Sequence, residues 1–187
     1  MTRQRRHKAR RPLSAASTGS KSQIHSAVRT RRSAFRIEFA VRHRLLRINR
    51  RGLARLACSV LERERVAKAE ISVAIVDDAQ IHAVNRDFLG HDYPTDVISF
   101  LLDGDGERGT QSARVSRGET GKSIDGEIVI SAETALRNAA RYRVGPDREL
   151  ALYLVHGLLH LCGYDDRSPG ERRLMRRREA EALAAVG

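Results

Sequence analysis

Residues 150–166 of this chain read LALYLVHGLLHLCGYDD, and this stretch decides the fold. Large apolar residues recur in it on every side of a helical repeat, which is typical of a helix buried on all faces. Pro146 suits the first turn of that helix, and Gly163 suits the turn that ends it. The sequence therefore predicts a buried central helix over about 147–162.

Four shorter stretches around this helix have the pattern of β-strands. Phe35-Arg-Ile-Glu-Phe-Ala-Val-Arg alternates apolar and polar residues, which is the period of a half-buried strand. Three further apolar runs predict strands at about 71–76, 96–102 and 127–131.

Apolar spacing of three and four residues and capping residues predict the other helices, at about 50–68, 79–88, 132–143 and 169–185. Residues 103–123 are rich in Gly, Ser, Arg and Asp without periodicity, so we expect a long exposed loop there. The fold class that follows is α+β: a mixed sheet of about four strands packed by helices, with the buried helix at its centre.

The net charge of +12 comes almost wholly from one end of the chain. Eleven of the 35 Lys and Arg residues precede the first carboxylate, Glu38, so residues 38–187 carry 24 bases and 23 acids. Residues 1–34 combine this charge with Ser, Thr, Gly and Ala and few large apolar groups. Such a composition cannot bury enough surface to order itself, so we expect a disordered basic arm followed by one folded domain over 35–187.

Three interpretations of the arm stay open: attraction to RNA phosphates, an organellar transit peptide, or a solvated extension. No hydrophobic segment follows it as in a secretory signal, and no apolar stretch approaches the roughly 18 to 20 residues of a membrane-spanning helix. Cys58 and Cys162 cannot make a disulfide framework. We therefore expect a reducing, cytoplasmic setting, with organellar import as an alternative, and no membrane partner.

His156 and His160 lie four residues apart, which puts both imidazoles on one face of the buried helix. Two histidines at this spacing are by themselves more often hydrogen-bonded residues than ligands. Here they interrupt an apolar helix, where an unpartnered imidazole is costly to bury. The turn at Gly163 lets Asp166 reach the same ion, and three protein ligands leave one position open, as in catalytic zinc sites.

Gly157 stands where the His-Glu-x-x-His proteases carry their general base, which argues against peptidase chemistry.

The stretch His156-Gly-Leu-Leu-His160-Leu-Cys-Gly-Tyr-Asp165-Asp166 resembles the signature His-Gly-x-Leu-His-Leu-x-Gly-Tyr-Asp-His of the YbeY family of rRNA maturation endoribonucleases. Pro94-Thr-Asp-Val-Ile-Ser-Phe100 resembles the family's Pro-Thr-Asp-Val-Leu-Ser-Phe block, and Gly126-Glu-Ile-Val-Ile-Ser131 resembles its Gly-Asp-Ile strand. The likeness runs in order over about 36–180. It implies the family's α+β fold and a zinc site that hydrolyses RNA.

Three positions depart from the family pattern. Asp166 replaces the third metal-binding His; a carboxylate is an accepted zinc ligand, but its charge widens the choice of divalent ion. Leu89 stands where the family has an Arg, so His91, Arg114 or Arg117 would have to supply that cation. The acid of the Gly-Asp-Ile strand is Glu127 here.

The resemblance thus implies a zinc-dependent endoribonuclease, specific for single strands, that acts in 16S rRNA 3′-end maturation and ribosome assembly. One Zn²⁺ per chain is expected at the metal ligands His156, His160 and Asp166. The expected partners are a ribosomal RNA precursor and the small ribosomal subunit or pre-ribosome. The other candidate site residues are Asp165, Glu127 and His91 for catalysis, and Thr95, Asp96, Ser99, Arg114 and Arg117 for substrate binding.

Some alternatives remain beside this interpretation. Without the resemblance, Pro-Thr-Asp before an apolar strand is ordinary turn chemistry, and Asp165 equally suits a role in orienting a histidine. The whole domain could also be a metal-binding ribosome-assembly factor with weak or no nuclease activity, or a hydrolase of another substrate.

Overall fold

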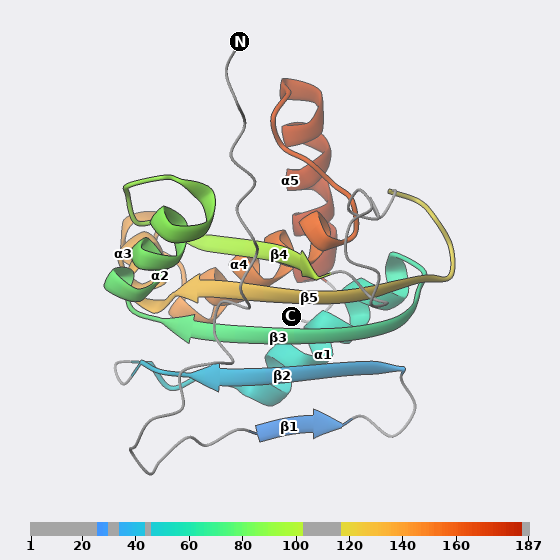
Figure 1. The fold of residues 1–187 in the computed structure, drawn as a ribbon, viewed down its shortest axis with the longest axis horizontal. Helices are drawn as coiled ribbons and strands as arrows, with labels where there is room; N and C mark the ends of the chain where they lie inside the picture. The colour runs from blue at the N-terminus through green and yellow to red at the C-terminus, as the bar shows by residue number, and fades with distance from the viewer. Residues whose placement is uncertain (1–25, 30–33, 44–45, 103–116, 185–187) are drawn as a thin grey trace.

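The computed structural model describes residues 26–29, 34–43, 46–102 and 117–184. Its centre is one five-stranded mixed sheet in the order β1-β2-β3-β5-β4. The strands are β1 (Ser26–Arg29), β2 (Phe35–Val41), β3 (Val66–Val76), β4 (Val97–Leu102) and β5 (Lys122–Ser131). Strands β2, β3 and β5 are parallel, whereas β1 and β4 run antiparallel at the two edges (Figure 1).

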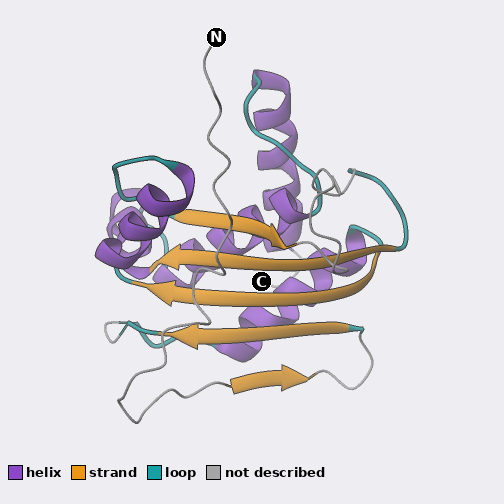
Figure 2. Ribbon diagram, in the orientation of Figure 1, coloured by secondary structure: helices purple, strands orange, loops and turns teal. Residues whose placement is uncertain are grey.

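Helices α1 (Arg50–Arg63) and α4 (Pro146–Leu161) lie behind the sheet in Figure 2. They cover the main core, to which Ile71, Ile128 and Leu158 belong. Helix α2 (Asp78–Val84) and the π-helical turn η1 (Asn85–Leu89) close a smaller core on the opposite face, around Ile81 and Val129. Helices α3 (Ala132–Tyr142) and α5 (Pro169–Ala184) complete the fold. The predicted α+β class is therefore confirmed.

Two glycines let α4 lie directly on β5. A Cβ atom on Gly157 would meet Cγ2 of Ile128 at 3.0 Å, and one on Gly126 would meet Cδ1 of Leu161 at 2.7 Å. Since Gly126 and Ile128 face α4 and side chains alternate along a strand, Glu127 faces away from this helix. The close packing fixes the height of the two histidines above the sheet.

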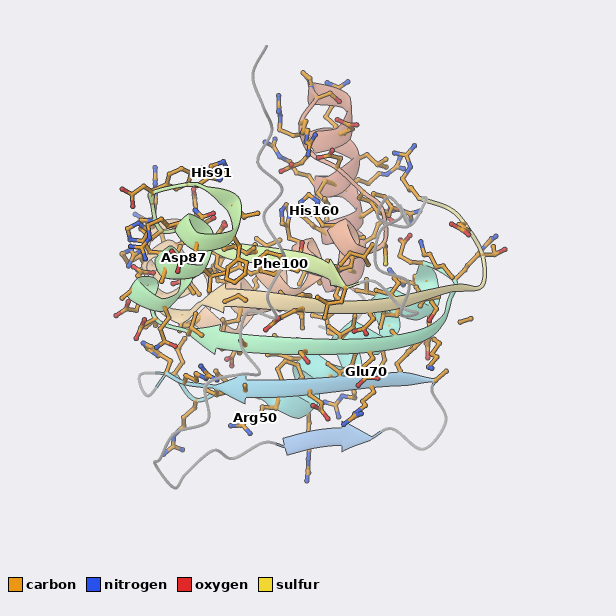
Figure 3. The ribbon with its side chains drawn as sticks, in the orientation of Figure 1. Arg50, Glu70, Asp87, His91, Phe100 and His160 are labelled. Carbon is orange, nitrogen blue, oxygen red and sulfur yellow. The ribbon has the colours of Figure 1, made fainter. Side chains whose placement is uncertain are left out.

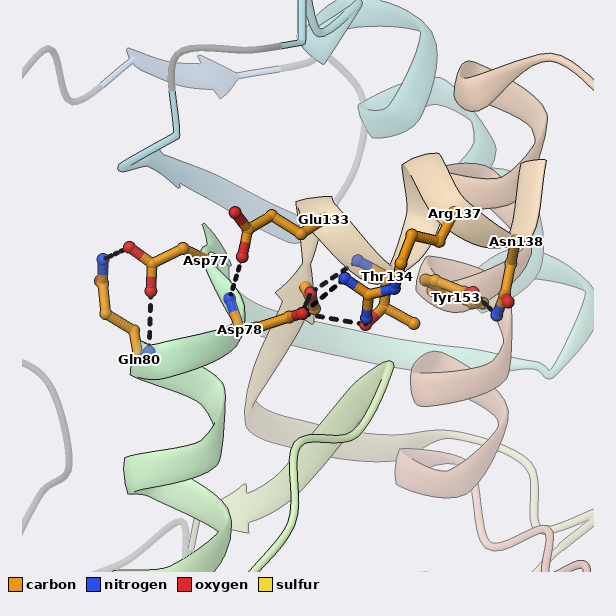
Figure 4. Close-up of polar contacts among 9 residues, drawn as sticks. Asp77, Asp78, Gln80, Glu133, Thr134, Arg137, Asn138 and Tyr153 are labelled. Atoms are coloured by element: carbon orange, nitrogen blue, oxygen red, sulfur yellow. Dashed lines mark hydrogen bonds and ion pairs between the residues drawn. The ribbon is translucent and has the colours of Figure 1, made fainter. Parts of the chain in front are cut away.

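Helix α2 is tied to α3 by polar side chains, which Figure 4 shows. Asp78 accepts hydrogen bonds from Ser131, from Thr134 Oγ1 at 2.9 Å and from Arg137 Nη1 at 2.6 Å. Ser131 also caps α3 by accepting the backbone N–H of Thr134 at 3.0 Å. This cluster joins the ends of β3 and β5 to the helices that follow them.

Helix α1 is shorter than predicted, and β3 is longer. The predicted helix extended to residue 68, but α1 ends at Arg63, and β3 begins at Val66 rather than near residue 71. Arg65 reverses the chain at φ 55°, in the left-handed region that glycine usually occupies. The extension was wrong because Val66 continues the apolar spacing of the helix although its side chain belongs to the strand.

Strand β1 falls within residues 1–34, where the sequence predicts a disordered arm, and it pairs with β2 from Ser26↔Phe39 to Arg29↔Arg36. The rest of the predicted arm, residues 1–25 and 30–33, lies outside the described residues, as do residues 103–116 of the loop predicted at 103–123. The last two residues of that loop, Lys122 and Ser123, instead begin β5. In the part of the chain that the structure describes, no helix has the length and apolar character needed to cross a membrane.

Candidate metal centre

His156 and His160 turn their Nε2 atoms toward each other on the outer face of α4. The two atoms lie 3.0 Å apart, and the rings meet edge to face with centroids 4.5 Å apart. Both side chains are half-buried. Because two imidazole lone pairs gain nothing by facing each other, this geometry is suited to an ion between them.

The turn after α4 returns the chain to the same point. Gly163 adopts φ 92°, and the backbone N–H of Tyr164 donates to the carbonyl of Leu159 at 3.0 Å, which closes the helix end. The buried ammonium of Lys122 donates to the carbonyl of Cys162 at 3.0 Å and fixes the turn from the sheet side. Asp166 then offers a carboxylate oxygen so that its ligand atom and those of both histidines all lie within 4.8 Å of one another.

The remaining nitrogen of each histidine has a partner that orients the ring. Nδ1 of His156 lies 2.7 Å from Oε1 of Glu179, and Nδ1 of His160 lies 3.0 Å from the backbone carbonyl of Tyr164. Both partners accept, so each Nδ1 carries the proton and each Nε2 keeps a free lone pair. Two such nitrogens and one carboxylate oxygen are a donor set that zinc accepts.

Charges around the pair move the two pKa values apart. Burial lowers the pKa of His156, but the hydrogen bond and charge of Glu179 outweigh it, so the pKa of His156 is raised. Burial and then the neighbouring His156 lower the pKa of His160, against the opposing charge of Asp166. His156 is therefore the ligand whose proton competes more strongly with an ion.

The three residues lie in a cleft of about 510 Å³. Four other candidates from the sequence line it as well: His91, Thr95, Ser99 and Asp165. Leu89 lines it too, at the position where the resemblance implies an Arg. The structure thus brings a possible metal-binding cluster, two hydroxyl groups and an imidazole into one cleft. In Figure 3 the labelled His91 and His160 both lie beyond the free edge of the sheet, which β4 forms.

Three predicted site residues are not among the described residues that line the cleft, and a fourth lies outside the described residues. The carboxylate of Asp96 accepts the backbone N–H of Val97 at 2.8 Å, so it shapes the turn before β4. Glu127 is on the face of β5 that points away from α4, and it is absent from the described residues that line the cleft. Arg117 lies over the ring of Tyr164, 5.9 Å from its centroid. Arg114 is outside the described residues.

Sequence reasoning missed two carboxylates that support the site. Glu179 projects from α5, in a helix whose Arg-rich sequence indicates only a charged surface. Buried Glu64 accepts the hydroxyl of Tyr164 at 3.0 Å and so holds the residue whose carbonyl orients His160. Neither residue belongs to a local motif, since Glu179 reaches the site from α5 and Glu64 from the turn that follows α1.

The chain is similar in sequence to known proteins. The chain is 41% identical over 140 residues to the endoribonuclease YbeY of Rhodopirellula baltica. The aligned region covers 74% of this chain and 64% of that protein. It is 43% identical over 135 residues to the endoribonuclease YbeY of Chloroflexus aggregans. Here the aligned region covers 71% of this chain and 84% of that protein.

Among solved structures, the solution structure of TM1509 from Thermotoga maritima shares the fold with a TM-score of 0.51 and 22% identity, covering 81% of this chain and 88% of that one. The family model described as Endoribonuclease YbeY matches residues 39–187. The resemblance seen in the His-Gly-Leu-Leu-His stretch is thereby confirmed, and the chain belongs to the YbeY family of endoribonucleases.

Proposed function

We propose that this chain is a zinc-dependent endoribonuclease that cuts single-stranded RNA, in 16S rRNA 3′-end maturation and ribosome assembly. One observation supports the proposal above all. The facing Nε2 atoms of His156 and His160, 3.0 Å apart, and the carboxylate of Asp166 lie in a cleft of about 510 Å³, where substrate can reach them. Family membership supplies the type of reaction.

His156, His160 and Asp166 would hold one Zn²⁺. When bound, the ion would supply an acidified water and a Lewis acid for a phosphoryl oxygen. Glu179 and the Tyr164 carbonyl keep the two rings in the ligating orientation. Asp165 accepts the backbone N–H of Asp166 at 2.8 Å, so we assign it the role of positioning the third ligand.

Thr95 and Ser99 line the same cleft and are the hydroxyl donors that we assign to phosphate oxygens. Arg167 also lines it and pairs with Asp165 at 3.2 Å, so a guanidinium stands beside the proposed ligands. His91 lies at the cleft and can donate through its ring nitrogens. We propose a precursor of small-subunit ribosomal RNA as the substrate, the pre-ribosome as the partner, and the cytoplasm as the location.

A second candidate is a metal-binding ribosome-assembly factor with little nuclease activity. The observation that favours it is Leu89, which is 46% exposed at the cleft. An isobutyl group cannot stabilise the negative charge that develops at phosphorus during cleavage. In this role the chain would bind the pre-ribosome without cutting RNA.

A cleavage assay with defined RNAs separates these functions. We expect the full chain to bind about one zinc ion and to cut a single-stranded RNA faster than the same sequence in a duplex. The His156→Ala variant should lose both metal and cleavage. The matched control is His82→Ala, because His82 is not among the described residues that line the cleft.

Cleavage that persists at the wild-type rate in metal-free His156→Ala would overturn the proposed enzyme. Stoichiometric zinc without cleavage, together with co-sedimentation with small ribosomal subunits, would establish the assembly factor instead.

A further inference from the structure

Exposed apolar side chains gather at the mouth of the cleft. The large hydrophobic residues with the most exposure in the described part of the chain are Phe88, Leu89, Tyr93, Leu101 and Tyr142. Leu89, Tyr93 and Leu101 line the cleft that holds the histidines. Phe88 adjoins them and packs its ring against Phe100 with centroids 5.9 Å apart. Exposed apolar groups that cluster in this way mark a binding surface rather than ordinary surface composition.

The most exposed ring at this mouth is already part of a stack. Tyr93 is 55% exposed, and its ring lies against that of His91 with centroids 5.5 Å apart and an interplanar angle of 11°. A parallel pair of this kind leaves the outer face of a ring available to a third planar group.

The backbone beneath the stack is fixed in place. Asn85 is only 2% exposed, and its side-chain amide donates to the carbonyl of Tyr93 at 2.7 Å. The backbone carbonyl of Asn85 accepts the N–H of His91 at 3.2 Å, and Gly90 between them adopts φ 72°. Because the loop is anchored at both ends, little conformational freedom is lost when a ligand stacks there.

The described residues that line the cleft carry little positive charge that would bind a phosphate backbone. Among the described residues that line it, Arg167 is the one Lys or Arg, and it lies beside the acids Asp165 and Asp166. Side-chain cations among the described lining residues therefore add little attraction for phosphates beyond that of the proposed ion, and the base is a further part of a nucleotide that can supply affinity. The planar bases of an unpaired strand are the groups that stack on exposed rings.

We propose that Tyr93, backed by His91 and flanked by Leu89 and Leu101, is a subsite that binds one unpaired nucleobase of the RNA substrate by stacking. This subsite rests on the proposed function, because the base would hold its neighbouring phosphodiester near the His156, His160 and Asp166 cluster. A base within a duplex is stacked between its neighbours and cannot enter. The subsite thus gives a physical basis for a preference for single strands.

The absence of tryptophan from the sequence provides a direct test. The Tyr93→Trp variant of the full chain carries one fluorophore at the subsite, and Tyr142→Trp is the matched control. Tyr142 is 60% exposed but lies at the end of α3, outside the residues that line the cleft. Each variant is titrated with a short 2′-O-methyl oligonucleotide, whose integrity is checked by electrophoresis after the titration, and with an abasic oligonucleotide of the same length and charge.

We expect the base-bearing strand to quench Tyr93→Trp and the abasic strand to leave it unchanged, with no quenching of Tyr142→Trp by either strand. The Tyr93→Ala variant should bind the base-bearing strand roughly 5- to 150-fold more weakly than wild type, which is the range for loss of one base stack. The abasic strand should bind wild type and Tyr93→Ala equally.

Equal binding of both strands by wild type, or quenching that is the same at positions 93 and 142, would overturn the subsite. If the subsite is overturned in this way but the wild type still cleaves RNA, the proposed function is retained. If the base-bearing strand quenches Tyr93→Trp but the wild type does not cleave RNA, the base subsite is supported and the proposed nuclease activity is contradicted.

Discussion

Glu179 and His156 form a carboxylate–imidazole pair across two helices: Oε1 of Glu179 lies 2.7 Å from Nδ1 of His156. The side chains are 14% and 25% exposed, so water screens the contact only in part. The pair links α5, which carries no residue of the metal-binding motif, to the first histidine of that motif. Helix α5 is thereby a support of the site as well as a cover for the core.

We expect Glu179→Gln to weaken zinc binding about 10- to 100-fold, the usual cost of losing a partner that orients a ligating histidine. Glutamine keeps the shape of the side chain but loses the charge. Competition against a chromophoric chelator measures the affinity. Glu181→Gln is the control, since Glu181 pairs with Arg177 and Arg178 on the same helix. Equal effects of the two substitutions would mean that general charge on α5, rather than the contact with His156, governs the affinity.

Asp166→His should tighten zinc binding and reduce binding of Mn²⁺, because imidazole suits zinc whereas carboxylate oxygen suits manganese. The carboxylate lies within 4.8 Å of both histidine ligand atoms, so the replacement nitrogen has the same point to reach. Calorimetry with each ion gives the ratio of affinities. Arg167→His, at a side chain that is 87% exposed, tests whether any extra histidine has this effect. An unchanged ratio in Asp166→His would show that Asp166 is not a ligand.

Gly157→Ala tests the packing of α4 on β5. The new methyl would meet Ile128 Cγ2 at 3.0 Å, and such overpacking costs about 1–3 kcal/mol, against roughly 1 kcal/mol gained in helix propensity. We expect a net loss of stability in urea unfolding. Gly170→Ala in α5 meets nothing closer than 4.0 Å and should be neutral or stabilising.

The partner substitution Ile128→Ala completes a double-mutant cycle for this contact. The double variant should lose less stability than the two single variants together, because the smaller side chain leaves room for the methyl. Strict additivity would contradict the steric explanation.

The juxtaposition of His156, His160 and Asp166 could be predicted because it depends on local geometry. Helical spacing sets the first two, and a turn at Gly163 brings in the third within six residues. Glu179 could not be predicted, since it reaches His156 only through the packing of α5 on α4. A contact of that kind leaves no spacing signal in the sequence.

Glu127 and β1 show two other limits. The motif singles out Glu127 as an acid, but strand alternation relative to Ile128 turns it to the opposite face of β5. The sequence predicts that Glu127 and Ile128 face opposite sides of the sheet, but it does not predict which of these sides α4 covers. Strand β1 has four residues and lies in a polar stretch, so its pairing with β2 has no apolar pattern to indicate it.

Removing residues 1–25 should weaken RNA binding and flatten its dependence on salt, while zinc binding stays unchanged. This deletion spares β1 and takes away seven Lys and Arg and no acid. Each phosphate contact on a single strand contributes roughly 0.7 to the slope of log K against log salt, so the slope should fall by up to about five. Binding titrations at several salt concentrations measure it. An unchanged slope would show that these residues do not contact RNA.

Asp78→Asn should destabilise the protein at neutral pH and much less in acid. Burial raises the pKa of Asp78, but hydrogen bonds from Arg137, Ser131 and Thr134 outweigh it and hold the pKa below its usual value (Figure 4). The folded state therefore binds this proton less tightly than the unfolded chain. The stability that follows is present above the unfolded pKa of about 3.9 and is lost as the pH falls through the lower folded pKa.

Because the Asp78 side chain is 24% exposed, we expect a loss of only about 0.5–2 kcal/mol at pH 7 in urea unfolding, and convergence of wild type and variant as the pH falls through the folded pKa. Asp77→Asn is the matched control: Asp77 caps α2 by accepting the N–H of Gln80 at 2.8 Å, and asparagine caps a helix as well as aspartate does. A loss for Asp78→Asn that stays the same from pH 7 to the lowest pH at which the protein folds would mean that its hydrogen-bond geometry, and not its charge, stabilises the junction between α2 and α3.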